Sequence, residues 1–139
     1  MIRTKKFKVV YVPGTWDLFH VGHLRILKRA WKLADWVIAG VNTDLSVLLH
    51  KGACPIIPFE DRVKILKACR YVDEVVKRIV PVRAKKLKRL GVEVFVLGSD
   101  WKGKALEGLD KAIKAGIKVK YFSYTKNIST TEIQRKLKK

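Results

Sequence analysis

Two histidines three positions apart lie in the stretch GTWDLFHVGH, which runs from Gly14 to His23. Gly14 permits a tight turn, and Gly22 leaves room for a phosphate to lie against the backbone. At the start of a helix, His20 and His23 would project to one side, beside free N–H groups and the positive end of the helix dipole. Without a third histidine, a cysteine or a nearby pair of carboxylates, they make a poor zinc site. Neither has a neighbouring serine or cysteine nucleophile, so the pattern predicts binding of an anion.

Apolar runs alternate with amphipathic stretches along the whole chain. Continuous apolar strands separated by helices are typical of a parallel sheet covered on both faces, and right-handed crossovers favour a doubly wound, Rossmann-like topology. We therefore predict one α/β domain over residues 1–139. Its five strands are expected at Phe7–Val12, Trp36–Asn42, Asp73–Val80, Val92–Gly98 and Lys118–Tyr124, and its helices at Val21–Ala34, Phe59–Cys69, Arg83–Leu90 and from Thr130 onward.

In such sheets, ligands bind beyond the carboxyl ends of the strands, where the strand order reverses. Residues that follow the first, second, fourth and fifth strands are therefore expected to be functional. The formal net charge of +19 fits a nucleic acid, an anionic membrane surface or a phosphate-rich small ligand. Lysines such as Lys85, Lys86 and Lys88 alternate with apolar residues at helical spacing, which predicts a solvated helix face.

The cysteines and the lengths of the apolar stretches predict a soluble protein with reduced thiols. Cys54 and Cys69 have neither CxxC nor metal-ligand spacing, so both are interpreted as reduced, non-catalytic thiols. No apolar stretch approaches the roughly 18 residues needed to span a membrane, and we expect a cytoplasmic protein without membrane insertion. Abundant lysine with scarce glutamine, asparagine and methionine is typical of hyperthermophiles.

Several ordered motifs resemble a known family. GTWDLFHVGH is similar to the Gly-Thr-Phe-Asp…His-x-Gly-His signature of the nucleotidyltransferase superfamily. RYVDEV (Arg70–Val75), GSDWKGK (Gly98–Lys104) and ISTTEI (Ile128–Ile133) resemble the cytidylyltransferase branch, most closely the glycerol-3-phosphate cytidylyltransferases. HKGACPIIPFEDR (His50–Arg62) resembles the lysine-glycine loop of ethanolamine-phosphate cytidylyltransferases and heptose-phosphate adenylyltransferases.

The resemblance implies transfer of CMP from CTP to a small phosphomonoester, first of all glycerol 3-phosphate, with release of pyrophosphate. The phosphate of the acceptor would be the nucleophile, so no general base is required, and catalysis reduces to positioning and to stabilising charge on the α-phosphoryl group. Mg²⁺ would accompany the triphosphate. The family further implies a homodimer, with no obligatory nucleic acid partner.

Carried over by motif, the expected site has three sets of residues and no dedicated metal ligand. The catalytic set is His20, His23, Lys51 and Arg70. The nucleotide-binding set is Gly14, Thr15, Trp16, Gly22, Asp100, Ser129 and Thr130. The acceptor-binding set is Asp17, Arg62, Trp101 and Lys126. Structural alternatives exist for several: Asp17 as a cap of the following turn, Arg70 as a surface residue, Trp101 as a partial core residue, and Ser129 with Glu132 as a capping box.

One segment departs from the family pattern. The family shows Arg-Thr-x-Gly before Ile-Ser-Thr-Thr, whereas this chain has Tyr124 at the arginine position and Asn127 at the glycine position. Asn tolerates a left-handed backbone, and Lys126 could supply the missing charge. The identity of the acceptor is therefore open. The alternatives are an adenylyltransferase acting on a sugar phosphate or on flavin mononucleotide, a phosphoethanolamine or phosphocholine cytidylyltransferase, and a non-catalytic nucleic-acid-binding module.

Overall fold

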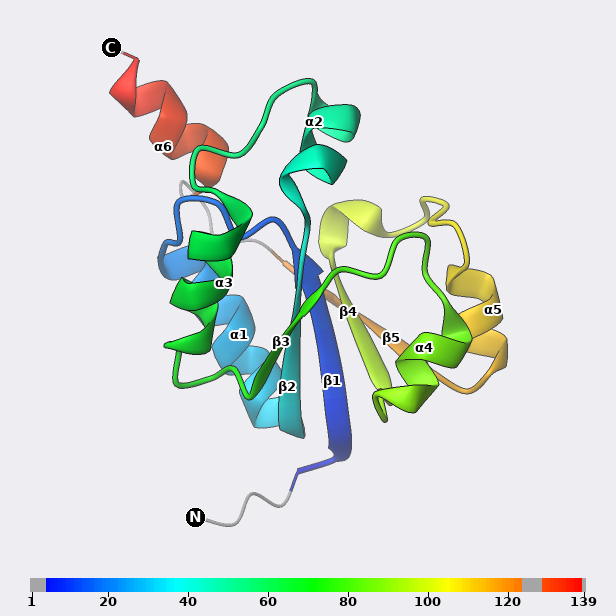
Figure 1. Cartoon of the computed structure of the whole chain (residues 1–139). Coiled ribbons are helices and arrows are strands. Elements are labelled where there is room, and N and C mark those ends of the chain that lie inside the picture. The colour runs from blue at the N-terminus through cyan, green and yellow to red at the C-terminus, as the bar shows by residue number, and fades with distance from the viewer. Residues whose placement is uncertain (1–4, 124–128, 139) are drawn as a thin grey trace.

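Five parallel strands form one sheet, in the order β3-β2-β1-β4-β5, in the computed structural model of the protein, which describes residues 5–123 and 129–138 (Figure 1). The elements are β1 (Phe7–Gly14), α1 (Val21–Leu33), β2 (Ala34–Val41), α2 (Asp44–Lys51), α3 (Phe59–Lys67), β3 (Glu74–Lys77), α4 (Ala84–Arg89), β4 (Val94–Gly98), the 3₁₀ turn η1 (Ser99–Trp101), α5 (Leu109–Lys114), β5 (Lys118–Phe122) and α6 (Thr130–Leu137). The predicted five-stranded parallel sheet is confirmed.

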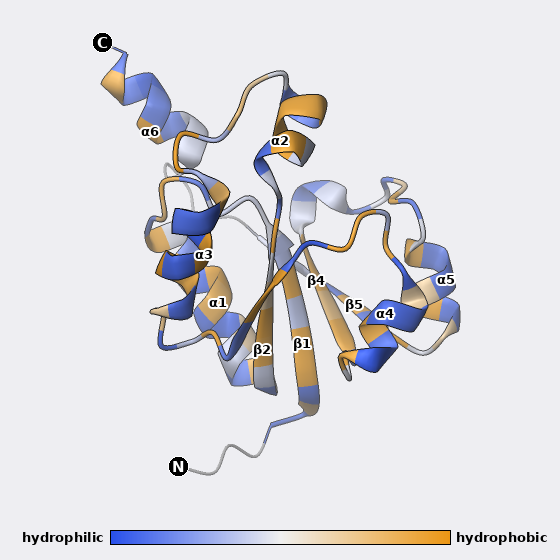
Figure 2. Cartoon of the chain, in the orientation of Figure 1, coloured by the Kyte–Doolittle hydropathy of each residue, from blue (hydrophilic) through white to orange (hydrophobic). Residues whose placement is uncertain are grey.

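Helices cover both faces of the sheet. Successive residues of a strand point to opposite sides, and both sides of these strands carry apolar residues that must be buried. Val10 and Val12 belong to the core cluster on the side of α1 and α3, whereas Tyr11 belongs to the cluster on the side of α4 and α5. Figure 2 shows the apolar central strands between helices whose outer faces are hydrophilic. Both apolar faces of the sheet are thereby removed from water, which is the main driving force for this fold.

The strand order reverses between β1 and β4. β1 pairs with β2 along its whole length, from Phe7 opposite Ala34 to Gly14 opposite Val41. On its other side it pairs with β4, which is followed directly by η1. The loops after β1 and β4 therefore leave the sheet at its switch point, where this class of fold binds ligands.

Two helices and the bounds of the strands differ from the sequence prediction, most importantly at the end of β3. The structure has helices α2 and α5, which the periodicity did not reveal, and β3 ends at Lys77 instead of continuing to Val80. Signals for α2 were present: the Thr43 hydroxyl caps its start by accepting from Ser46 N–H, and Gly52 ends it in the left-handed region at φ 80°. Its eight residues are too few to show a clear helical period.

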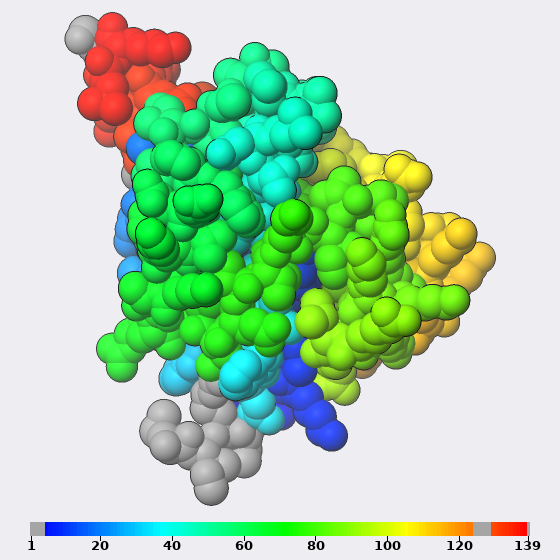
Figure 3. Space-filling model, in the orientation of Figure 1, coloured from blue at the N-terminus to red at the C-terminus, as the bar shows by residue number. Residues whose placement is uncertain are grey.

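At the carboxyl edge of the sheet, α2 and α6 extend beyond the ends of the strands (Figure 1), and they form the upper end of the molecule in Figure 3. The described residues contain no helix long and apolar enough to cross a membrane.

Candidate active site

His20 and His23 form the start of α1. His20 is the N-cap residue, and its Nδ1 accepts the backbone N–H of Gly22 at 3.0 Å. In return, His23 Nδ1 accepts the backbone N–H of His20 at 3.3 Å. This reciprocal arrangement is a capping box built from two histidines in place of the usual Ser/Thr and Glu/Gln. The two rings are stacked, with centroids 3.9 Å apart.

These contacts define the protonation of both rings. Because each Nδ1 accepts a hydrogen bond, the single proton of the neutral imidazole lies on Nε2, on the opposite side of the ring from the backbone. Burial lowers the pKa of His20. Burial, and then the charge of His20, lower the pKa of His23 to about 3, against an opposing effect of Asp17. At neutral pH the pair therefore presents two Nε2–H donors.

Aromatic side chains hold His23 in place. Its ring lies 5.3 Å from the Trp16 ring and 5.4 Å from the Phe19 ring, measured between centroids. The loop that carries these residues is strained, because Trp16 and Leu18 have φ values of 60° and 48°, which side-chain-bearing residues rarely adopt. Such strain persists where the surroundings dictate the backbone, and it is concentrated at functional sites.

The start of α6 meets the same loop. The Thr130 hydroxyl donates to the Asp17 carbonyl oxygen at 2.7 Å, and the Ser129 hydroxyl caps α6 by accepting from Glu132 N–H at 3.0 Å. The predicted cap is therefore confirmed, although the Glu132 carboxylate pairs with Arg135 at 2.6 Å. The N-termini of α1 and α6 thus converge on the loop after β1, and both present positive dipole ends to an anion.

Asp17 has a structural role that replaces the predicted acceptor contact. Its side chain is 3% exposed, and its carboxylate accepts N–H groups from Ile56 at 2.8 Å, from Ile57 at 2.9 Å and from Leu18 at 3.1 Å. These bonds fasten the loop between α2 and α3 to the loop after β1. The sequence did not show this, because the partners are backbone groups 39 and 40 residues away.

Arg62 is the second correction. Its side chain is fully buried, and it donates to the carbonyl oxygens of Ile57, Thr15 and Asn42 and to the Asp44 carboxylate. The guanidinium binds together the segments after β1 and β2 and the start of α3, so it is not available to an acceptor.

Trp16 is the third correction, because its indole is only 4% exposed and donates to the Gly40 carbonyl oxygen at 3.0 Å. The side chain belongs to the core, which leaves only its backbone for nucleotide binding. Gly14 suits this packing, since a Cβ at that position would lie 3.0 Å from the Trp16 ring and would press against it. Gly22 is buried in the first turn of α1.

Arg70 lies at the wrong edge of the sheet for its predicted catalytic role. It is exposed, between α3 and β3, where Asp73 N–H bonds to the Val37 carbonyl near the start of β2. This turn is at the amino edge, opposite the loop after β1 (Figure 1). Within one chain, Arg70 does not reach His20. The catalytic role of Arg70 therefore stays a prediction that a single copy of the chain does not fulfil.

A cleft of about 640 Å³ adjoins the loop after β1. Three predicted residues line it: Thr15 after β1, Lys51 at the end of α2, and Trp101 in η1, which also packs against the core cluster beside α4 and α5. The exposed Asp100 precedes Trp101 at the switch point. Lys126, with Tyr124 and Asn127, falls outside the described residues.

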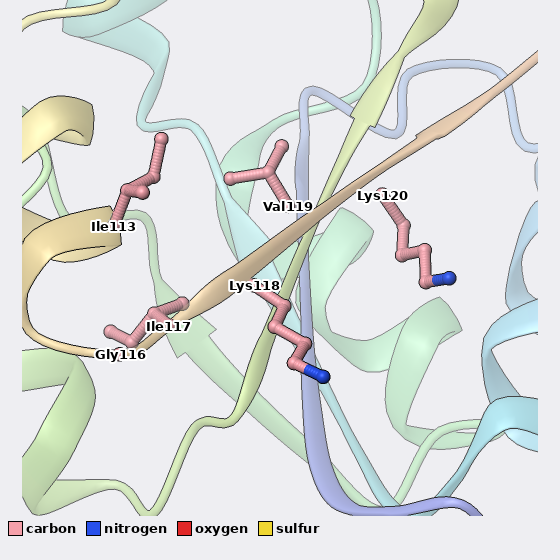
Figure 4. Close-up of a pocket in the computed structure, with 6 residues that line it drawn as sticks. All are labelled: Ile113, Gly116, Ile117, Lys118, Val119 and Lys120. Atoms are coloured by element: carbon pink, nitrogen blue, oxygen red, sulfur yellow. The ribbon is translucent and has the colours of Figure 1, made fainter.

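The cleft also contains residues that sequence reasoning missed, notably Asn42 after β2 and Arg78 after β3. Asn42 Nδ2 donates to Thr15 Oγ1 at 2.9 Å, and Arg78 Nη1 donates to Asn42 Oδ1 at 3.2 Å. Their position directly after strands was the available signal, but the third strand was predicted to continue past Arg78. A second hollow, of about 410 Å³, lies along the edge strand β5 and contains none of the predicted site residues (Figure 4).

The described residues contain no group of three or more His, Cys, Asp or Glu side chains that could hold a metal ion. The one carboxylate in the loop after β1, that of Asp17, is occupied by backbone N–H groups. The site thus offers hydrogen-bond donors and cations, which suit phosphate oxygens. It has the elements needed to orient a phosphoryl group and to stabilise negative charge on it.

Comparisons with known proteins agree with this chemistry. A profile of the cytidylyltransferase-like family matches residues 11–136. A glycerol-3-phosphate cytidylyltransferase of Bacillus subtilis is 34% identical over 131 residues, which cover 94% of this chain and 97% of that protein. An FAD synthase of Pyrococcus horikoshii is 43% identical over 97 residues, or 69% of this chain and 65% of that protein.

Among solved structures, a lipopolysaccharide core biosynthesis protein of Thermoplasma volcanium superimposes with a TM-score of 0.66 at 25% identity, covering 85% of this chain and 96% of that one. The profile match begins within β1, ends within α6 and includes every described element between them, and the bacillary relative aligns over nearly its full length. The chain belongs to the cytidylyltransferase-like family of nucleotidyltransferases.

Proposed function

We propose that the protein transfers CMP from CTP to a small phosphomonoester, with glycerol 3-phosphate as the first candidate, and releases pyrophosphate. The observation that carries this proposal is the His20–His23 pair, two neutral imidazoles with free Nε2–H donors at the start of α1, beside the loop after β1 that the start of α6 also contacts. Two relatives of nearly the same length are glycerol-3-phosphate cytidylyltransferases, from Bacillus subtilis and Staphylococcus aureus.

The reaction requires positioning more than acid–base chemistry. A phosphate oxygen of the acceptor forms a bond to the α-phosphorus of CTP, while the bond from that phosphorus to the bridging oxygen of pyrophosphate breaks. The attacking oxygen is already anionic, so no proton has to be removed. His20 and His23 donate Nε2–H bonds to the phosphoryl oxygens on which charge develops, an effect that is large in a preorganised site. Lys51, an exposed residue that lines the cleft, attracts the triphosphate.

Mg²⁺ is proposed as part of the substrate, bound to the triphosphate. Phosphate oxygens and water supply most ligands of such an ion, which reduces the charge repelling the nucleophile. We also propose a cytoplasmic homodimer. A contribution from Arg70 to catalysis would have to come from the second copy, because in its own chain it lies at the opposite edge of the sheet.

A second candidate is adenylyl transfer to flavin mononucleotide. Part of the cleft wall is apolar, and three of its residues, Leu45, Leu49 and Val80, are 63%, 79% and 59% exposed. Such a wall suits the flat ring system of a flavin better than it suits glycerol. The FAD synthase of Pyrococcus horikoshii is the relative that motivates this candidate.

A pyrophosphate-release assay separates the candidates. CTP and ATP are each tested against glycerol 3-phosphate, phosphoethanolamine, phosphocholine, heptose 1-phosphate and flavin mononucleotide, with His20→Asn as the control for contaminating activity. Pyrophosphate from CTP and glycerol 3-phosphate is the expected result. Turnover only with ATP and flavin mononucleotide would assign the second candidate. Tight, salt-sensitive binding of nucleic acid without consumption of any nucleotide would refute both.

A further inference from the structure

Arg78 is a cation in the cleft whose function the family motifs do not assign. It directly follows β3, and its backbone N–H donates to the Val41 carbonyl oxygen at 2.9 Å, which anchors this position to the end of β2. Its Nη1 donates to Asn42 Oδ1 at 3.2 Å, and Asn42 Nδ2 donates in turn to Thr15 Oγ1 at 2.9 Å. This chain of contacts places the guanidinium beside the loop that leads to His20.

The guanidinium has donors to spare. In the ranges that the structure describes, the ion pairs are Arg62 with Asp44 and Arg135 with Glu132, and Arg78 has no carboxylate within 4.0 Å. One of its five N–H groups bonds to Asn42. The side chain is half-buried, and burial lowers its pKa while the Tyr11 hydroxyl raises it. A partly desolvated guanidinium without a carboxylate is costly, unless a ligand supplies the missing negative charge.

The rest of the cleft favours the same kind of ligand. Its lining includes three formally cationic side chains, Lys51, Lys77 and Arg78, and no aspartate or glutamate from the described residues. Asp17 lies two positions after Thr15, which lines the cleft, but its carboxylate is buried and accepts backbone N–H groups. An ammonium group in this cleft would therefore meet cations and no carboxylate.

We propose that Arg78 binds the phosphate of the acceptor and selects anionic phosphomonoesters over those with an ammonium headgroup. This inference rests on the proposed function and refines it, because it names the acceptor class. A guanidinium can contact two phosphate oxygens at once, leaving the third to attack the α-phosphorus. Asn42 orients the guanidinium for that contact.

Arg78→Gln and Arg78→Lys test the proposal, with Arg89→Gln as the matched control on the exposed surface of α4. For Arg78→Gln we expect KM for glycerol 3-phosphate to rise about 10- to 100-fold, the range for a lost charge-assisted hydrogen bond. KM for CTP should stay within about twofold, because the lost contact is with the acceptor alone. Lysine keeps the charge without the two-pronged geometry, so Arg78→Lys should be intermediate.

Acceptor selection is the second kinetic measurement. Wild type should favour glycerol 3-phosphate over phosphoethanolamine in kcat/KM by at least about tenfold, since an unpaired ammonium beside these cations is costly. Arg78→Gln should reduce that preference, because one of the three cations that repel the ammonium is lost while Lys51 and Lys77 remain. A merely structural role would instead alter KM for CTP or kcat for both acceptors. A wild-type preference for phosphoethanolamine, or an unchanged preference in Arg78→Gln, would overturn the proposal.

Calorimetric titration with glycerol 3-phosphate alone separates this inference from the proposed function. Loss of binding in Arg78→Gln, with Arg89→Gln unaffected, would support the acceptor contact even if CTP were not consumed. CTP turnover with equal binding and equal acceptor KM in wild type and Arg78→Gln would leave the proposed function standing and refute the role of Arg78.

Discussion

His20 and His23 both use Nδ1 to cap the start of α1: His20 Nδ1 accepts the Gly22 N–H, and His23 Nδ1 accepts the His20 N–H, with the ring centroids stacked 3.9 Å apart. One side of each ring therefore stabilises the helix, and the other side carries the donor for a ligand. Helix capping and phosphate binding use different atoms of the same imidazoles, and substitutions can separate the two roles.

His20→Asn should keep the cap and lose the ligand donor. The side-chain oxygen of asparagine can accept the hydrogen bond that Nδ1 accepts, but the shorter asparagine has no atom at the position of Nε2. We expect kcat to fall at least about 100-fold, the scale for one donor to a charged intermediate. The free energy of unfolding should change little, whereas His20→Ala should lose activity and about 1 kcal/mol of stability. Steady-state kinetics and urea unfolding measure the two effects. Full activity in His20→Asn would contradict the donor role.

Stability should depend on pH through His23. Its pKa is about 3 in the folded protein and 6.5 for an ordinary histidine, so below pH 6.5 the unfolded chain takes up a proton that the folded protein does not. The free energy of unfolding is therefore highest above pH 6.5 and falls as the pH decreases toward 3, by up to about 1.4 kcal/mol per pH unit from this residue.

Urea unfolding at a series of pH values should show a shallower dependence in His23→Asn than in wild type. Carboxylates titrate in both proteins and cancel in the comparison. Identical slopes would mean that His23 is not held neutral by burial.

Arg62→Lys should destabilise the protein by about 3 kcal/mol, because lysine cannot satisfy the buried carbonyl oxygens of Thr15, Asn42 and Ile57 together. Arg25→Lys, on the exposed side of α1, should change the free energy of unfolding by less than about 0.5 kcal/mol. Urea unfolding measures both. A variant of normal stability with a raised KM for the acceptor would restore the binding role that the sequence suggested for Arg62.

Lys51→Ala should lower kcat/KM for CTP by about tenfold or more, because a cation that lines the cleft is lost. The fold should be unaffected, since the Lys51 side chain is exposed at the end of α2. Lys85→Ala, on the exposed face of α4, is the control and should have wild-type kinetics. The loss should diminish as salt is added, because the attraction is screened. Equal kinetics in the two variants would place Lys51 among the merely solvating lysines.

The sequence by itself determined the sheet and the position of the site. Apolar runs at Phe7–Val12 and Val92–Gly98 indicated buried parallel strands, and the histidines of GTWDLFHVGH followed the first of them. Their spacing placed both at a helix start, and the cap of α6 was readable from Ser129. These features are local, since they depend on hydrophobic periodicity and on residues within one turn of each other.

Only the tertiary structure decided which polar residues are free to bind a ligand. Asp17 and Arg62 match family motifs, yet their charges are taken up by backbone groups brought from elsewhere in the chain. Arg70 and Arg78 are eight positions apart in the sequence, but β3 carries the chain from one edge of the sheet to the other between them. A side chain's burial and its distant partners follow from how the strands order and the loops pack. No local pattern of residues encodes that arrangement.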